Sequence, residues 1–180
     1  MKVLDAGAYG LIAPLINTAD DARALVESSR YPPLGKRSYG PHRAMLYAGA
    51  DYATHANDEV LVLGMIETRE GVANLDEILE VDGLDGIYIG PADLALSHGE
   101  KPGFDHGEGQ LDTIIQTLIA SCRWKGKLVG IHNGTPEHAS SMLARGCNLV
   151  TAGSDASLLV NGSRGILKAM GLQTQNGDVY

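Results

Sequence analysis

Apolar residues along the chain come in blocks rather than singly. Five short apolar runs have the length of strands and cover, in order, residues 11–16, 60–66, 86–89, 128–131 and 148–152. The run 60–66 is apolar almost throughout, which is typical of a strand covered on both faces. Each run is followed by a helix or by a connection that contains one. This alternation predicts an α/β fold built on a parallel sheet.

The helical pattern is clearest over residues 110–125, where apolar residues recur at intervals of three and four. The same reasoning predicts helices over 19–28, 71–80 and 157–170, and from Thr135 onward. Segment 29–41 is rich in Pro, Gly and basic residues, so a long ordered loop is expected there. His42 and His55 lie in a polar segment and are expected to be solvated.

A carboxylate follows each of two consecutive predicted strands. Glu67 comes directly after the run 60–66, and Asp93 comes shortly after the run 86–89. A helical crossover makes these strands parallel, so both carboxylates emerge at the carboxyl edge of one sheet. Neighbouring strands lie roughly 4.8 Å apart, and two carboxylates at that separation can share one divalent cation. The alternative for Glu67 is an acid that the dipole of the next helix stabilises.

The tetrapeptide Gly90-Pro91-Ala92-Asp93 predicts a turn that brings the backbone close to the mouth of the sheet. The N–H groups of Ala92 and Asp93 can then point at a carboxylate of a bound molecule. Arg69 is a candidate for orienting the first of the two carboxylates from the side.

Three other residues are candidates for contact with a substrate. His132 follows the run 128–131 and so faces the same mouth as the two carboxylates. It is a candidate for substrate contact or for a replacement base, and a hydrogen-bonded structural histidine is the alternative. Arg37 and Arg43 can bind a substrate carboxylate, or they form surface salt bridges or subunit contacts.

Two patterns that can be mistaken for metal sites are expected to be structural. The Asp-His-x-Glu sequence of Asp105, His106 and Glu108 lies among glycines, which predicts a lid or a surface loop. Cys122 and Cys147 lie in apolar surroundings without C-x-x-C spacing, so buried thiols are expected rather than a disulfide or a zinc site.

Composition narrows the possible function classes. The net charge of −8 leaves no basic patch for phosphates, which argues against nucleic-acid binding. No apolar run approaches the ~20 residues of a membrane span, so a soluble cytoplasmic protein with no membrane contact is expected. At 180 residues the chain is predicted to form one domain, 1–180, with 173–180 as a flexible tail.

Two stretches, MIETREGVANLDEIL and GIYIGPADLALSHG, resemble the metal-site signature of the HpcH/HpaI aldolase family. These proteins are metal-dependent pyruvate aldolases of the phosphoenolpyruvate/pyruvate barrel superfamily. The resemblance continues through GAYGLIAPLINTADDA, RYPPLGKRSYGPHRA and VTAGSDASLL, nearly the whole chain. It implies an α/β fold of the TIM type, a (β/α) barrel of eight units. Such a barrel takes about 250 residues, so this chain would hold about five units and be incomplete at its amino end.

The resemblance also implies a site and a reaction. Mg²⁺, Mn²⁺ or Co²⁺ would bind Glu67 and Asp93, and pyruvate would chelate the ion while contacting residues 90–93. The implied enzyme is a class II pyruvate aldolase that cleaves or forms 2-keto-4-hydroxy acids, with pyruvate and an aldehyde as its small-molecule partners, through a stabilised pyruvate enolate. The family's catalytic His and carboxylate-binding Arg come from about three strands ahead of the match, and no position here corresponds to them.

Three hypotheses therefore remain open at the level of sequence. The chain is an active aldolase, a metal-binding fragment without turnover, or a citrate-lyase-like lyase acting on a coenzyme A ester. An open five-stranded sheet has two exposed edges, which favour pairing with another copy. A homo-oligomer is therefore expected, and in the family the terminal helix exchanges between subunits.

Overall fold

Five parallel strands pair in the order in which they occur along the chain. In the computed structural model, which describes residues 2–172, the sheet order is β1-β2-β3-β4-β5. The strands are β1 (Gly10–Ala13), β2 (Leu61–Ile66), β3 (Gly86–Ile89), β4 (Leu128–Ile131) and β5 (Leu149–Val150). Every neighbouring pair is parallel. This order confirms the predicted α/β parallel sheet, and the predicted tail 173–180 lies outside the described residues.

The first strand is shorter than its apolar run. β1 ends at Ala13, because Pro14 has no N–H for the ladder and Leu15 has a positive φ of 56°. The chain then turns back, and the N–H of Ile16 donates to the carbonyl of Met65 at 3.2 Å. The sharp bend aims the backbone of Leu15 toward the end of β2.

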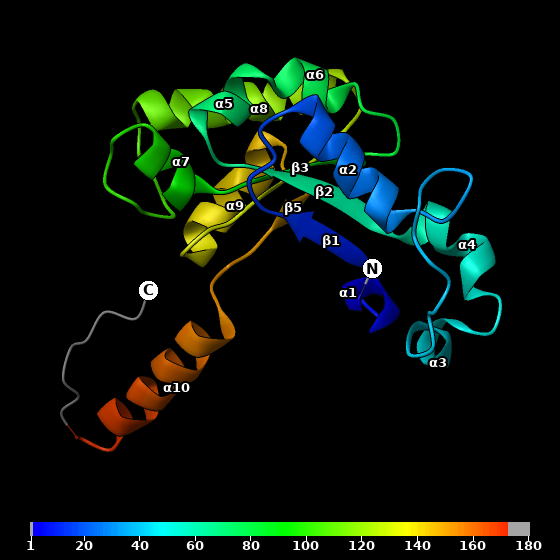
Figure 1. The fold of residues 1–180 in the computed structure, drawn as a ribbon. Coiled ribbons are helices and arrows are strands. Elements are labelled where there is room, and N and C mark those ends of the chain that lie inside the picture. Colours follow the sequence, from blue (N-terminus) through cyan, green and yellow to red (C-terminus); the bar gives the residue numbers. More distant parts are fainter. Residues whose placement is uncertain (1, 173–180) are drawn as a thin grey trace.

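Helices lie between and around the strands, and most of them form a layer on one face of the sheet (Figure 1). In chain order they are α1 (Lys2–Asp5), α2 (Ala19–Ser29), α3 (Ala44–Ala48), α4 (Tyr52–Glu59), α5 (Arg69–Ala73), α6 (Leu75–Leu79), α7 (Pro91–Ser97), α8 (Gln110–Trp124), α9 (Pro136–Arg145) and α10 (Asp155–Ala169). None of these helices is both long enough and apolar enough to cross a membrane.

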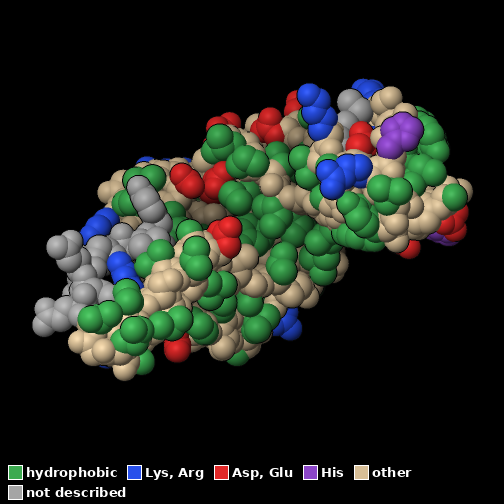
Figure 2. Space-filling model, turned by 90° about the horizontal axis from the view of Figure 1, so that it is seen from below, with side chains coloured by type: hydrophobic (Ala, Val, Ile, Leu, Met, Phe, Trp, Pro, Cys, Tyr) green, Lys and Arg blue, Asp and Glu red, His purple; other side chains and the backbone are tan. Residues whose placement is uncertain are grey.

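Alternate residues of each strand separate the two faces of the sheet. The residues that face the helices are fully buried in the core: Val62, Ile66, Ile87, Ile89, Val129 and Ile131. On the opposite, inner face, Ile12 is 42% exposed, Leu128 is 37% exposed and Leu149 is 40% exposed. Figure 2, which views the molecule from below, shows hydrophobic side chains gathered over the middle of the molecule. The face under the helices is therefore fully buried, whereas the inner face is exposed only in part, since Leu63 and Tyr88 on it are buried.

Two helical regions differ from the expectation from sequence. The segment 42–59 contains α3 and α4, and α4 buries only Tyr52 and Ala56, which is too few apolar residues to give a visible periodicity. The predicted single helix over 71–80 is divided into α5 and α6 at Asn74, whose φ of −96° and ψ of 10° leave the helical region. His55 is exposed, as predicted.

α10 stands apart from the body of the molecule (Figure 1). It has 15 residues and none of them is buried. A capping box formed by Ser154 and Ser157 fixes its start. Local capping therefore defines this helix, whereas α8, of the same length, buries five side chains against the sheet and its neighbours.

Candidate active site

The two predicted carboxylates meet at the carboxyl edge of the sheet. Ile66 of β2 pairs with Ile89 of β3, so the next residues along, Glu67 and Gly90, are also neighbours. The ladder continues past the strand ends, because the N–H of Gly90 donates to the carbonyl of Ile66 at 3.2 Å. α7 begins directly after Gly90, so Asp93 lies in the first turn of a helix rather than in the predicted turn.

Glu67 is held in place by the backbone around it. The residue is 4% exposed, and its Oε1 accepts a hydrogen bond of 2.8 Å from the N–H of Leu15. Burial raises the pKa of the Glu67 carboxyl, the Leu15 hydrogen bond acts in the opposite direction, and the nearby charge of Asp93 raises the pKa further. Asp93 is therefore close enough for its charge to act on Glu67, although burial has the larger effect on the Glu67 pKa.

Asp93 is exposed, and within residues 2–172 its side chain has no hydrogen bond or ion pair. Nor does any Lys, Arg or His of the described chain form an ion pair with Glu67. Hard divalent cations prefer carboxylate oxygens, so an uncompensated pair of this kind fits such an ion. In the described part of the chain, no group of three or more His, Cys, Asp or Glu side chains could hold a metal.

Gly90 is required by the position of Glu67. A Cβ atom added to Gly90 would lie 2.6 Å from Oε2 of Glu67 and 3.0 Å from its Cβ. The carboxylate therefore lies over the backbone of Gly90, in the space that any side chain would take. No side chain caps α7, and the N–H groups of the first turn of a helix have no partner within the helix. Pro91 is the first residue of that turn and has no N–H.

Arg69 does not orient Glu67, contrary to the prediction. Its guanidinium donates to the carbonyl of His98 at 2.9 Å, and its N–H donates to the hydroxyl of Ser97 at 2.9 Å. Arg69 therefore connects the start of α5 to the end of α7. The backbone N–H of Leu15 orients Glu67 instead. The sequence could not predict this contact, because a backbone donor does not depend on the type of side chain.

The basic loop holds a buried ion pair rather than a substrate contact. Arg37 is fully buried, donates to Asp5 at 2.8 Å and to the hydroxyl of Tyr52 at 3.1 Å, and lies over the ring of Tyr31. Arg37 therefore forms an ion pair, as one alternative predicted, but the prediction of a surface position is wrong because the guanidinium is buried. Arg43 is exposed and its nearest polar partner is the Tyr47 hydroxyl, at 3.5 Å.

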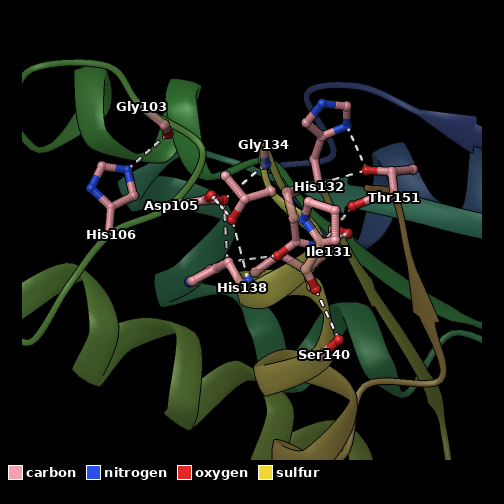
Figure 3. A network of polar contacts seen from close by, with 12 residues as sticks. Gly103, Asp105, His106, Ile131, His132, Gly134, His138, Ser140 and Thr151 are labelled. Atoms are coloured by element: carbon pink, nitrogen blue, oxygen red, sulfur yellow. Dashed lines mark hydrogen bonds and ion pairs between the residues drawn. The ribbon is translucent and has the colours of Figure 1, made fainter. Parts of the chain in front are cut away.

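The Asp-His-x-Glu loop is fixed by hydrogen bonds (Figure 3). Asp105 accepts from the N–H of Gly134 at 2.8 Å and from the hydroxyl of Thr135 at 2.6 Å, and it lies 3.3 Å from His138. His106 contacts the carbonyl of Gly103 at 2.9 Å. These contacts attach the loop to the start of α9, and the two histidines bond to different groups. The prediction of a loop agrees with this arrangement.

His132 lies beside two hydroxyl groups at the ends of β4 and β5. Its Nδ1 is 3.0 Å from Oγ1 of Thr151 (Figure 3). The hydroxyl of Tyr88 lies 3.4 Å from the same nitrogen. A cavity of about 250 Å³ adjoins the ring and is lined by Phe104 and Ser157, among others. A separate cavity of about 640 Å³ lies among residues of α8 and α9, away from all strand ends. We therefore do not assign the second cavity to this site.

Both cysteines are buried and free, as predicted. Burial raises the pKa of the Cys122 thiol to about 12 and that of the Cys147 thiol to about 11. Both groups are therefore inert thiols at neutral pH.

Comparison with known proteins identifies the family of this chain. A family model described as HpcH/HpaI aldolase/citrate lyase matches residues 1–162. A hydroxypyruvate/pyruvate aldolase of Rhizorhabdus wittichii is 45% identical over 167 residues, which are 93% of this chain and 66% of that protein. A 2-keto-3-deoxy-L-rhamnonate aldolase of Escherichia coli is 41% identical over 160 residues, 87% of this chain and 59% of that protein. The chain thus spans less than two thirds of the length of both relatives.

The fold has a close counterpart among solved structures. An HpcH/HpaI aldolase/citrate lyase family protein from Burkholderia cenocepacia superposes with a TM-score of 0.82 at 32% identity, over 94% of this chain and 67% of that one. The five parallel strands therefore correspond to a half-barrel of the TIM type, as the resemblance implied.

Proposed function

Because the chain belongs to the HpcH/HpaI aldolase/citrate lyase family, we propose that it acts as a metal-dependent class II pyruvate aldolase. Such an enzyme cleaves 2-keto-4-hydroxy acids into pyruvate and an aldehyde, or joins these two molecules. Both relatives described above are named aldolases, which supports the reaction class. The partners of the proposed site are small molecules.

The observation that carries the proposal is the pair of Glu67 and Asp93. The charge of Asp93 contributes to the raised pKa of Glu67, yet no cation of the described chain forms an ion pair with either carboxylate. Mg²⁺, Mn²⁺ or Co²⁺ bound to the pair would supply a positive charge beside the keto oxygen and the carboxylate of pyruvate. In this proposal Leu15 and Gly90 fix the position of the Glu67 carboxylate.

The backbone after β3 has the second role in the proposed site. The N–H groups of Ala92 and Asp93 lie in the first, uncapped turn of α7 and are free to donate to the carboxylate of pyruvate. Gly90 and Pro91 determine where that turn begins. In this way residues 90–93 bind and orient the substrate while Glu67 and Asp93 hold the ion.

One observation favours a second candidate function, which is metal binding without turnover. Removal of a proton from pyruvate needs a base, and among residues 2–172 no His or Arg contacts Glu67 or Asp93. A site without a base would bind the ion and pyruvate but not release the proton. The loss of general-base assistance typically lowers a rate by about 10²- to 10⁴-fold.

We also propose that the protein assembles with copies of itself. Apolar residues of α10 are exposed in the single chain, including Leu158, Leu159 and Ile166. Apolar surfaces of this extent mark contact sites. Sedimentation velocity gives the test, because a monomer at micromolar concentration would contradict this part of the proposal.

Exchange of the methyl protons of pyruvate for deuterium, followed by proton NMR, tests the proposed function. We expect exchange that requires Mg²⁺ or Mn²⁺, disappears with EDTA and is lost in Asp93→Ala. Asp58→Asn is the matched control, because Asp58 is an exposed acid on α4, away from the carboxyl edge. Metal binding without exchange would support the second candidate, and the absence of metal binding in a folded chain would exclude both.

A further inference from the structure

The inner face of the sheet places one row of residues around the proposed site. Met65, Tyr88, Gly130 and Leu149 pair across β2, β3, β4 and β5. Side chains of residues i and i+2 lie on the same face of a strand, so the next row toward the mouth consists of Glu67, Gly90, His132 and Thr151. The ladder reaches this row, because the N–H of His132 donates to the carbonyl of Ile89 and that of Thr151 to the carbonyl of Ile131.

In this row Gly90 separates Glu67 from His132. Neighbouring strands lie roughly 4.8 Å apart, so the backbones of Glu67 and His132 are about 10 Å apart with no side chain between them. The Glu67 carboxylate already lies over Gly90. A molecule of several carbon atoms that is held at Glu67 and extends along the row therefore meets the imidazole of His132.

The hydroxyl groups around His132 define which of its nitrogens carries the proton. Thr151 Oγ1 accepts from the N–H of Asn133 at 3.3 Å, lies 3.2 Å from the Tyr88 hydroxyl and lies 3.0 Å from His132 Nδ1. Every group is satisfied when Tyr88 donates to Thr151 and Thr151 donates to Nδ1. Burial raises the pKa of Tyr88, so the phenol keeps the proton that it donates. Nδ1 is then an acceptor, and the proton of the neutral imidazole is on Nε2.

The other side of the ring is fixed by packing and left open at Nε2. The ring of Phe104 lies 4.8 Å from that of His132, centroid to centroid. Within residues 2–172, Nε2 has no hydrogen-bond partner, although its residue lines the cavity of about 250 Å³. The structure therefore presents a positioned N–H donor without an acceptor of its own.

We propose that His132 binds the aldehyde-derived oxygen of the substrate through its Nε2–H and that Thr151 and Tyr88 are positioning residues for it. The inference rests on the proposed aldolase function. In the synthetic direction, the methyl group of pyruvate first loses a proton to hydroxide from the solvent, and the electron pair of the resulting enolate then forms a bond with the carbonyl carbon of the aldehyde. The π electron pair moves to the aldehyde oxygen, where the N–H bond stabilises the negative charge, and the oxygen then takes a proton from water. Cleavage follows the same steps in reverse.

The kinetic test separates this role from that of the two carboxylates. In His132→Ala, we expect aldol addition of pyruvate to glycolaldehyde to fall by about 10²-fold, as for the loss of one such donor elsewhere. Deuterium exchange of pyruvate alone should stay within about twofold, because it involves no aldehyde. His132→Gln, which keeps an N–H donor, should recover part of the addition rate. His55→Ala is the matched control, since His55 is exposed on α4. Equal loss of exchange and addition would overturn the proposal.

A second measurement tests the inference even if the chain proves inactive. The ¹⁵N shifts of labelled histidine distinguish an Nε2–H from an Nδ1–H tautomer, and we expect Nε2–H for His132, with a change in Thr151→Val but not in the exposed control Thr117→Val. We also expect 2-keto-4-hydroxybutanoate to bind at least tenfold more weakly to His132→Ala in the presence of Mn²⁺. An Nδ1–H tautomer, or unchanged binding, would overturn the assignment of His132. A wild-type chain with neither exchange nor addition would instead refute the aldolase function.

Discussion

The two faces of the sheet carry side chains with different roles, although the same strands form both faces. The helix-covered face consists of fully buried aliphatic residues, whereas the inner face leaves Ile12, Leu128 and Leu149 exposed. At the carboxyl edge, the inner face carries Glu67, His132 and Thr151, whereas the polar Asn133 on the covered face is buried and donates to the carbonyls of Ile131 and Thr151. Strand alternation therefore separates the residues that stabilise the fold from those available for chemistry, and neighbouring positions along one strand differ in role.

The largest expected difference between the faces concerns stability. We expect Ile89→Ala to lower the free energy of unfolding by about 2–5 kcal/mol, because Ile89 is fully buried against the helices and leaves a cavity. Ile12→Ala, on the inner face, should cost less than about 1 kcal/mol, since that side chain is already 42% exposed. Urea unfolding followed by circular dichroism measures both. Equal losses would mean that the inner face is covered in solution, as it would be by another copy of the chain.

The second prediction concerns the edge where the faces end. Gly90→Ala places a Cβ against Oε2 of Glu67 and must displace the carboxylate. We expect the affinity for Mn²⁺ to fall by about 10- to 100-fold, the usual effect of disturbing the support of a metal ligand. Isothermal titration calorimetry measures this affinity. Gly107→Ala is the control, because a Cβ there has no neighbour within 4 Å. Unchanged Mn²⁺ affinity in Gly90→Ala would exclude Glu67 as a ligand.

The covered face is also the part that the sequence predicts well. β3 and β4 have the bounds expected from their apolar runs, since a strand buried on the helix side needs aliphatic residues and ends where they end. α3 and α4 were not predicted, because short polar helices bury too few residues to show a period. The periodicity of apolar residues reflects which side chains are buried. It therefore cannot identify a helix that buries few of them.

From the sequence, only the two acidic side chains of the candidate site could be predicted. Glu67 and Asp93 could be placed at one edge from strand direction alone. The sequence could not predict the role of the Leu15 N–H, because this role depends on a bend in the backbone. Nor could it predict the contact of Thr151 with His132, which depends on the register between β4 and β5. Tyr88 lies within an apolar run, so its sequence position indicates a core residue. Only the structure shows that its hydroxyl lies beside that of Thr151.

A smaller effect is expected from an ion pair in the helix layer. Arg145 of α9 donates to Asp112 of α8 at 2.7 Å and lowers the pKa of the Asp112 carboxyl. A lowered pKa means that the pair stabilises the fold above the unfolded pKa of Asp, about 3.9, and that this stability is lost as the pH falls through the folded value. We expect Asp112→Asn to cost about 1 kcal/mol at pH 7 and progressively less as the pH is lowered below about 4. A loss that does not depend on pH would show that packing, and not charge, is responsible.

The smallest effect on stability is expected from Glu67 in the absence of metal. Its ionised carboxylate destabilises the fold, whereas the ionised carboxylate of Asp112 stabilises it. Burial and the charge of Asp93 raise the pKa of Glu67, so the folded chain binds this proton more tightly than the unfolded chain does. Stability is then lost as the pH rises from the unfolded pKa of Glu, about 4.3, through the folded value, and it stays lower above that.

Glu67→Gln removes this cost, so we expect the metal-free variant at pH 7 to melt slightly above the wild type, with no difference near pH 4. Saturating Mn²⁺ should reverse the order, because it stabilises only a chain that binds it, by about 2.7 kcal/mol at a hundredfold excess over Kd. Differential scanning calorimetry with and without the ion measures both effects. A variant whose melting temperature in EDTA is lower than that of the wild type would contradict this prediction. Glu67 would then stabilise the metal-free fold, whereas we expect it to destabilise that fold.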